Sequence, residues 1–241
     1  MSREASSRKK GKDKNELGKM RRRIVELEGL EAAHKQVQEE LRKKVEELRR
    51  TMKGTIYAMA LTVEMRDPYI AGHQRNVTDL VSAIAKTMEL SDEEAEGIRL
   101  AAAIHDVGRT AVPIEIFAKP AQLSDPEFAI VKTHPKVGHD ILKMINFPWP
   151  IAEITFQHHE RMDGSGYPRH LSGKDIILGA RIVAVGDVVE AMCARRPHRP
   201  AQGIEKALEE ITKNRETLYD PKVVDACLQL FQEKEFGFGQ T

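Results

Sequence analysis

The chain is organised around one stretch, Ile98-Arg99-Leu100-Ala101-Ala102-Ala103-Ile104-His105-Asp106-Val107-Gly108. This pattern predicts an apolar helix that ends in a histidine and an aspartate. Successive helix residues point about 100° apart, so adjacent residues normally meet different neighbours. A metal ion at the helix end can be reached by both side chains. A His-Asp pair alone is a weak signal, because a core histidine beside a surface aspartate gives the same pattern.

Further potential metal ligands lie far from this stretch in the sequence, most of them at predicted helix ends. They are His73, His134, His158, His159 and Asp187. Asp187 follows the apolar run at 182–186, where an unpaired carboxylate would be costly to bury. Each residue alone is better explained as a core or surface residue. Together with His105 and Asp106, they favour one shared centre for a pair of divalent ions and predict metal-assisted hydrolysis.

The composition favours an all-α protein. The 241 residues include 41% apolar but only 5% aromatic side chains, and no stretch alternates with a period of two. Capping boxes are predicted at Ser91 and Ser124, and Asp220 before Pro221 predicts a third helix start. Loops rich in proline and glycine are expected at 112–123, 146–150, 162–175 and 194–203. We expect a compact bundle of about seven or eight helices.

A long amphipathic helix is predicted before the bundle. Its apolar residues fall on one seven-residue register, namely Leu17, Met20, Ile24, Leu27, Leu41, Val45, Leu48 and Met52. His34 and its seam neighbours are polar, which resembles a stutter in a coiled coil. We therefore expect a basic disordered arm at 1–16, a coiled-coil signalling and dimerisation helix at 17–54, and a catalytic domain at 55–241. A homodimer through the coil is favoured over a helix that packs on its own domain.

Other classes of protein are disfavoured. The net charge is +1, and the basic run at 8–12 lacks interleaved aromatic residues, so no nucleic-acid partner is expected. Cys193 and Cys227 have no CxxC spacing and suggest neither a disulfide framework nor a thiolate zinc site. No apolar run approaches the roughly 20 residues that a membrane span needs, and the N-terminus is polar. The expected location is the cytoplasm.

An ordered set of motifs resembles the HD-GYP family, a branch of the HD phosphohydrolase superfamily. The motifs are Arg66-Asp67-Pro68-Tyr69, Gly72-His73, His105-Asp106-Val107-Gly108, Lys119-Pro120, His134-Pro135 with Gly138, His158-His159-Glu160-Arg161-Met162-Asp163-Gly164-Ser165-Gly166-Tyr167-Pro168, Ala180-Arg181-Ile182 and Arg196-Pro197. The long central motif is very specific. The resemblance extends over roughly residues 55–235 and implies an HD-domain fold.

The resemblance also implies an activity and a set of roles. The activity is hydrolysis of cyclic di-GMP to linear pGpG, in some members on to GMP, by in-line attack of a hydroxide shared by two metals. One metal would be held by His73, His105, Asp106 and Asp187, and Asp106 would bridge to a second held by His134, His158 and His159. The implied catalytic residues are His105, Asp106 and Arg109. The implied substrate contacts are Asp67, Arg109, Tyr167, Glu190, Arg196 and Arg199.

Three positions depart from the family pattern. Tyr69 stands where members of the three-metal type carry a glutamate, so we predict two metals. Iron or manganese is favoured over zinc by a histidine-rich, carboxylate-bridged site without thiolates. Arg109 replaces a common lysine and Glu190 a common aspartate. Both changes keep the charge but alter the reach of the side chain.

Two other functions stay open at this stage. The metal ligands bind only the phosphoryl centre, so the substrate could be a hybrid cyclic dinucleotide. A weakly active signalling module that binds nucleotide or a diguanylate cyclase partner is the rival of another class. A full set of seven ligands counts against the latter, because a binding module has no chemical need for them. The coil would couple the domain to an upstream sensor or to a second copy.

Overall fold

The computed structural model describes residues 2–66, 72–195 and 200–238, with side chains from residue 16 onward. It divides into two units, Met1–Met52 and Lys53–Thr241. The described residues form helices and two isolated bridges but no sheet, which confirms the predicted all-α class. Among them, no helix combines the length and apolar composition that crossing a bilayer requires.

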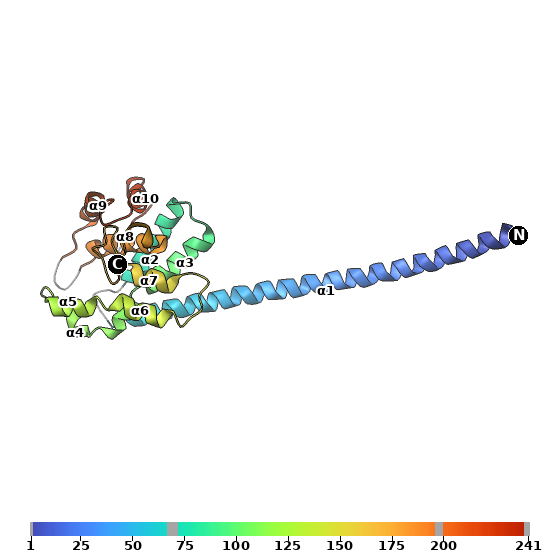
Figure 1. Ribbon diagram of the computed structural model, residues 1–241, viewed down its shortest axis with the longest axis horizontal. Helices are drawn as coiled ribbons and strands as arrows, with labels where there is room; N and C mark the ends of the chain where they lie inside the picture. The colour runs from blue at the N-terminus through green and yellow to red at the C-terminus, as the bar shows by residue number, and fades with distance from the viewer. Residues whose placement is uncertain (1, 67–71, 196–199, 239–241) are drawn as a thin grey trace. The chain divides into compact units, whose positions relative to one another are not determined.

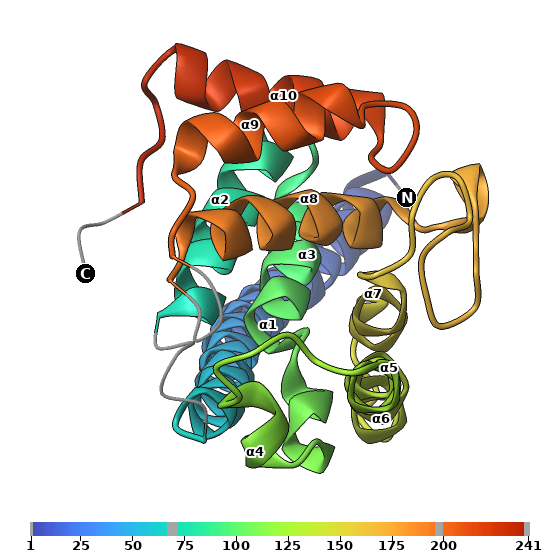
Figure 2. The ribbon, with the colours of Figure 1, turned by 90° about the vertical axis from the view of Figure 1, so that its left-hand side faces the viewer.

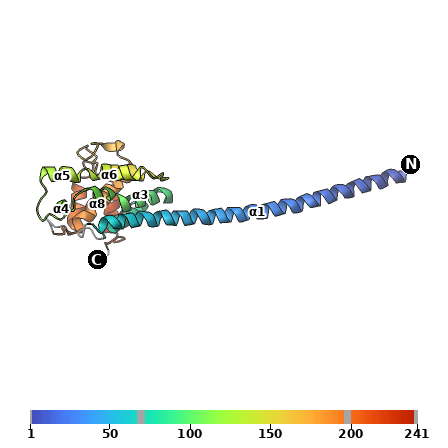
Figure 3. The ribbon, with the colours of Figure 1, turned by 90° about the horizontal axis from the view of Figure 1, so that it is seen from below.

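Helix α1 (Ser2–Glu64) is one unbroken helix (Figures 1 and 3). It includes residues 2–16, which belong to the segment 1–16 for which we expected a disordered arm. The helix continues there because the segment contains no proline and is rich in lysine, arginine and glutamate, which are good helix formers. Within the first unit, the apolar residues of the predicted seam face solvent, with Leu17 53% and Leu48 69% exposed. The boundaries of the three predicted segments stay predictions.

The second unit contains the end of α1 and nine further α-helices in its described residues (Figure 2). They are α2 (His73–Thr87), α3 (Asp92–Ile104), α4 (Ile114–Phe117), α5 (Asp125–Val131), α6 (His134–Leu142), α7 (Ile151–Gln157), α8 (Leu178–Cys193), α9 (Ile204–Lys213) and α10 (Pro221–Gln232), with two 3-10 helices, η1 (Val107–Ala111) and η2 (Gly173–Asp175). The count exceeds the predicted seven or eight. Helix α4 falls in the expected loop at 112–123, because a single turn is too short to produce a periodic pattern.

The predicted helix starts are confirmed. Ser91 and Ser124 each form a capping box, in which the serine hydroxyl and a glutamate three residues later satisfy backbone N–H groups reciprocally. The Asp220 carboxylate accepts a hydrogen bond of 2.8 Å from the backbone N–H of Lys222, at the start of α10. These caps fix where each helix begins, and so where its side chains point.

Helix α8 lies at the centre of the second unit. It is apolar around most of its circumference, which is typical of a helix surrounded by others. Helices α2, α3, α7, α9 and α10 all pack against it, and Figure 2 shows α9 and α10 as a layer on one side of it. The ends of α3 and α7 and the start of α2 carry predicted ligands, and α8 carries Asp187. Packing around α8 therefore gathers these residues.

Candidate metal centre

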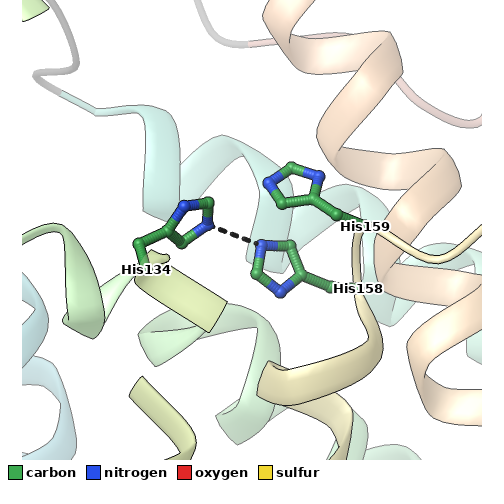
Figure 4. A group of neighbouring side chains, drawn as sticks. All are labelled: His134, His158 and His159. Carbon is green, nitrogen blue, oxygen red and sulfur yellow. Dashed lines mark hydrogen bonds between the residues drawn. The ribbon is translucent and has the colours of Figure 1, made fainter. Parts of the chain in front are cut away.

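Two groups of potential metal ligands form in the second unit. One consists of His73, His105 and Asp106, and the other of His134, His158 and His159. In each group, the ligand atoms lie within 4.8 Å of one another. Figure 4 shows the second group, in which Nε2 of His134 and Nε2 of His158 are 3.2 Å apart.

Asp187 adjoins the first group from α8. Its Oδ1 atom lies 3.4 Å from Nε2 of His73 and 3.9 Å from Nε2 of His105. The structure therefore brings together all seven residues that the sequence singled out. They come from α2, the end of α3, the start of α6, the end of α7, and α8.

Asp106 stands between the two groups. Its Oδ2 atom lies 3.7 Å from Nε2 of His105 and 3.8 Å from Nε2 of His73. Its other oxygen, Oδ1, lies 3.3 Å from Nε2 of His134. The two oxygens of one carboxylate thus face different sets of imidazoles, which is the arrangement of a carboxylate that bridges two cations.

Backbone carbonyls orient three of the imidazoles. The Nδ1 atoms of His105, His134 and His158 are 2.7, 2.7 and 2.6 Å from the carbonyl oxygens of Ala102, Val131 and Thr155, respectively. Each carbonyl belongs to the residue three positions earlier, so local helical geometry supplies the partner. A hydrogen bond from Nδ1–H leaves the lone pair of Nε2 free to bind a metal ion, as in metal-binding histidines.

Carboxylates orient His73 instead. Its Nδ1 atom pairs with Oε2 of Glu190, and the other oxygen of Glu190 accepts a hydrogen bond of 3.3 Å from Asn76. The start of α2 is held by Glu64, whose carboxylate accepts from the backbone N–H of Gln74 at 2.9 Å and that of Gly72 at 3.4 Å. The end of α1 therefore fixes the turn that carries His73.

Two glycines allow η1 to approach α6 closely. A Cβ atom on Gly108 would lie 2.5 Å from the backbone nitrogen of Gly138 and 2.9 Å from the carbonyl carbon of His134. A Cβ atom on Gly138 would lie 2.8 Å from Cγ2 of Thr155. Because Asp106 immediately precedes η1 and His134 begins α6, this contact sets the separation of their side chains.

The site favours ionised carboxylates and, in the second group, neutral imidazoles. Burial opposes ionisation of Asp106, but Arg109, His105 and His134 together hold its pKa well below the usual range. Burial and then the nearby His105 and His134 lower the pKa of His158 to about 3. These are the protonation states in which such groups bind metal ions.

His73 titrates in the opposite direction. Burial lowers its pKa, but the hydrogen bonds and charges of Asp187 and Glu190 outweigh burial and raise it to about 9. The carboxylates thus favour a positive charge at this point of the site.

The donor set fits divalent metal ions. The Nε2 atom of His105 is buried without a hydrogen-bond partner among the described residues, and the side chain is 0% exposed. A buried polar atom of this kind is uncommon and needs an explanation. A cation in the space that His73, Asp106 and Asp187 share with it would supply the missing partner, and imidazole and carboxylate are ligands that iron, manganese and zinc accept.

Arg109 and Tyr167 border the centre. Arg109 donates a 2.9 Å hydrogen bond from its guanidinium to Oδ2 of Asp106, and its guanidinium carbon lies 4.1 Å from the centre of the Phe117 ring. The Tyr167 ring lies 4.8 Å from the His159 ring, at an angle of 32°. Sequence reasoning placed both residues at the site, and the structure brings both to its edge.

Glu160 anchors the loop that carries Tyr167. It is buried, and its carboxylate accepts hydrogen bonds of 2.7 and 3.0 Å from the backbone N–H groups of Arg169 and Leu171. Gly166 passes so close to the backbone of 159–161 that no Cβ atom would fit. Sequence reasoning gave no role to Glu160 or Glu64. Glu64 lies among apolar residues, which was a signal, but the partners of both glutamates are backbone groups that only folding reveals.

Four residues to which the sequence analysis gave a functional role lie outside the described residues. They are Asp67, Tyr69, Arg196 and Arg199. Their expected roles, as substrate contacts or as the position that limits the centre to two metals, therefore stay predictions. Glu190 is described, and its buried carboxylate faces His73 and Asn76.

The model of the HD domain family matches residues 58–223. This chain belongs to the HD domain family. The match includes all seven potential ligands and begins near the end of α1, so the long N-terminal part of that helix lies outside the matched residues. The resemblance to the HD-GYP branch is confirmed by the relatives of this HD domain.

The relatives include two curated enzymes. A cyclic di-GMP phosphodiesterase of Thermotoga maritima is 41% identical over 172 residues, which cover 70% of this chain and 47% of the relative. The 3'3'-cGAMP-specific phosphodiesterase 3 of Vibrio cholerae is 35% identical over 167 residues, which cover 69% of this chain and 36% of the relative. The chain thus spans less than half the length of these relatives.

A solved structure supports the fold of the HD domain. The Vibrio cholerae cyclic GMP-AMP specific phosphodiesterase V-cGAP3 matches with a TM-score of 0.60 at 18% identity, covering 76% of this chain and 49% of that one. At this identity the likeness concerns the fold alone.

Proposed function

We propose that this chain is a metal-dependent phosphodiesterase that hydrolyses cyclic di-GMP to linear pGpG, and on to GMP if the linear product is retained. One observation carries the proposal. The two oxygens of Asp106 face two separate sets of imidazoles, at 3.7 Å from His105 and 3.3 Å from His134. A pair of cations that hydrolyses a phosphodiester must lie close together, and a carboxylate in this position would hold them so. The named activity of the Thermotoga maritima relative supports the choice of substrate.

We assign the metal ligands as the sequence analysis did. His73, His105, Asp106 and Asp187 would hold one ion, and Asp106, His134, His158 and His159 would hold the other. We favour two ions of iron or manganese, because the set is rich in imidazole and contains no thiolate. Divalent ions there would supply a nucleophile at neutral pH and neutralise the phosphoryl oxygens.

Residues around the metal ligands would then hold the ligand side chains in position and orient the phosphoryl group. The backbone carbonyls behind His105, His134 and His158 fix the tautomer of each ring before substrate arrives. Arg109 would keep Asp106 ionised and direct its guanidinium toward a phosphoryl oxygen, in a plane fixed by its contact with Phe117. Such preorganised donors lower a barrier because they need no rearrangement during the reaction.

We assign Glu190 to the orientation of His73 and not to contact with the substrate. Its carboxylate is buried against His73 and Asn76. The longer side chain compared with the usual aspartate suits this role, because it can reach Nδ1 of a ring on a neighbouring helix. Asp67, Tyr167, Arg196 and Arg199 remain proposed substrate contacts.

The test is anaerobic incubation of the purified protein with cyclic di-GMP, with products separated and metal counted on the same sample. We expect pGpG to form, about two ions of iron or manganese per chain, and loss of turnover after chelation with recovery on adding either metal. A protein that carries its metal but leaves cyclic di-GMP intact would refute the proposed substrate.

A second candidate substrate is the hybrid 3'3'-cGAMP. It is favoured by the Vibrio cholerae relative, which is named as specific for that nucleotide. The metal ligands themselves do not distinguish the two, because they contact only the phosphoryl group. The same incubation with 3'3'-cGAMP decides between them through the ratio of kcat/KM values.

We also propose that residues 17–54 pair with a second copy as a parallel coiled coil. The support is the exposed seam of α1, where Leu17, Leu27 and Leu48 are each at least half exposed. Sedimentation of a chain lacking residues 1–52 should then show a shift from dimer to monomer. An unaltered dimer would locate the interface elsewhere. An upstream sensor would act through this coil, whereas a diguanylate cyclase partner would bind the loop Gly166-Tyr167-Pro168.

A further inference from the structure

Helix α5 is held in place without contributing to the core. None of its residues, Asp125–Val131, is buried. Its start is fixed by the capping box of Ser124 and Glu127, and Lys119 binds the Glu127 carboxylate at 2.7 Å. A short helix gains most of its stability from burying an apolar face. The position of α5 therefore needs an explanation other than packing.

A line of aromatic rings connects α5 to the metal centre. The Tyr167 ring lies 4.8 Å from the ring of His159, one of the proposed ligands. The Phe128 ring of α5 lies 6.5 Å from the Tyr167 ring, with the two planes at 81°. Phe128 is 43% exposed, so part of its ring is open to solvent. The contacts of Phe128 with Tyr167 and of Tyr167 with His159 connect this exposed ring to the metal centre.

Lys132 places a positive charge beside these rings. Its ammonium nitrogen lies 4.7 Å from the centre of the Phe128 ring and 5.5 Å from that of Tyr167. It is exposed, and no carboxylate among the described residues lies within ion-pairing distance of it. The ammonium group therefore retains donors for a ligand.

The chemistry of this patch fits a purine base. Exposed aromatic rings bind nucleobases by stacking, whatever the base. The ammonium group of Lys132 can discriminate between bases, because it donates hydrogen bonds and accepts none. Guanine presents two acceptors, O6 and N7, on one edge, whereas adenine presents N7 beside an amino donor. A lysine at this edge accordingly favours guanine.

We propose that Phe128 of α5 and Lys132, the residue directly after α5, form with Tyr167 a base-recognition site that selects guanine over adenine in the substrate. The proposal rests on the proposed function, because it concerns the same cyclic dinucleotide. It adds two residues to the site and gives α5 the role of a specificity element. Phe128 supplies the stacking surface, and Lys132 supplies the donor to O6 and N7.

The test compares Lys132→Met and Phe128→Ala with the wild type. Matched controls are Lys136→Met, a lysine four residues later that pairs with Asp140, and Ile130→Ala, a residue of α5 that is 42% exposed. The substrates are cyclic di-GMP, cyclic di-AMP and bis(p-nitrophenyl) phosphate, a diester without a base. Metal content is measured for every variant.

Distinct results are expected for the two positions. Lys132→Met should lower kcat/KM for cyclic di-GMP by about tenfold or more, because it removes a contact to the guanine edge. It should reduce the preference over cyclic di-AMP and leave the base-free diester within about twofold. Phe128→Ala should lower kcat/KM for both cyclic dinucleotides by about tenfold, mainly through KM, since stacking is indifferent to the base. Phe128→Trp, which keeps an aromatic ring, should retain the wild-type kcat/KM for both cyclic dinucleotides.

Three outcomes would overturn the inference. They are an unchanged guanine preference in Lys132→Met, an equal loss on all three substrates in that variant, and an equal effect of the two control variants. Calorimetric binding of pGpG and pApA separates this inference from the proposed function. A wild type that binds pGpG more tightly than pApA through Lys132, yet hydrolyses no cyclic dinucleotide, refutes only the function. Hydrolysis with the preference intact in Lys132→Met refutes only the inference.

Discussion

The contact between η1 and α6 should set the distance between the two halves of the metal centre, and Gly108→Ala tests this. The new Cβ atom would lie 2.5 Å from the backbone nitrogen of Gly138 and 2.9 Å from the carbonyl carbon of His134. Ordinary van der Waals contact needs about 3.5 Å or more. Both neighbours are backbone atoms and cannot rotate away, so the two segments must separate by about 1 Å.

The cost can be worked out from this displacement. Overpacking of a core usually lowers the free energy of unfolding by about 1–3 kcal/mol. Asp106 and His134 are now 3.3 Å apart, whereas metal–ligand distances tolerate deviations of only about 0.2 Å. A misplacement of about 1 Å can reduce a rate by about 100-fold. We therefore expect a folded Gly108→Ala protein that has lost most of one metal and about 99% of its turnover.

Metal content, the rate of hydrolysis and thermal unfolding are measured on a series of glycine-to-alanine variants. Gly138→Ala should have a milder effect, because the nearest atom to its Cβ would be a side-chain methyl of Thr155, at 2.8 Å, and the backbone nitrogen of Gly108 would lie 3.4 Å away. Gly54→Ala is the control, since no atom outside its own helix lies within 4 Å, and alanine should stabilise α1 by about 0.5–1 kcal/mol. A Gly108→Ala protein with full metal content and full activity would refute this account of the site.

Three further substitutions probe single residues. Asp106→Ala should remove metal and reduce turnover by 100-fold or more, on the order expected for a lost bridging ligand, whereas Asp92→Ala at the exposed start of α3 should leave metal content unchanged. Glu64→Ala removes the hydrogen-bond acceptor at the start of α2 and should lower the free energy of unfolding by about 1 kcal/mol. It should also weaken metal binding at His73, as measured by metal titration. An unchanged metal affinity would show that Glu64 acts only as a helix cap. Glu160→Gln should lower the free energy of unfolding by about 1–3 kcal/mol and expose the loop at 162–175 to protease, and equal protease resistance would contradict its anchoring role.

The sequence predicted several features because their causes are local. The capping boxes at Ser91 and Ser124 consist of residues three apart, so a short window contains both partners. The seven potential ligands were identified because histidine and aspartate at the ends of apolar helices are unusual. Residues 2–16 are helical, which agrees with their strong helix propensity, whereas their high charge suggested a disordered arm.

Other features depend on contacts between segments that are distant in the chain. Glu190 contacts His73, 117 residues away in the sequence, and no local pattern predicted that contact. The anchoring by Glu160 and the close approach at Gly108 involve backbone groups, which carry no mark in the sequence.

Residue types and their order were sufficient to predict an all-α bundle and the chemistry of its ligands, because both follow from local periodicity and from the coordination preferences of imidazole and carboxylate. The HD domain itself was predicted from the resemblance of the ordered motifs to a known family. Only the tertiary structure decided that Asp106 stands between two sets of imidazoles and that α5 brings an exposed ring and a lysine to the border of the site. These arrangements depend on how α2, α3, α6 and α7 pack around α8, and such packing is determined by many weak contacts at once.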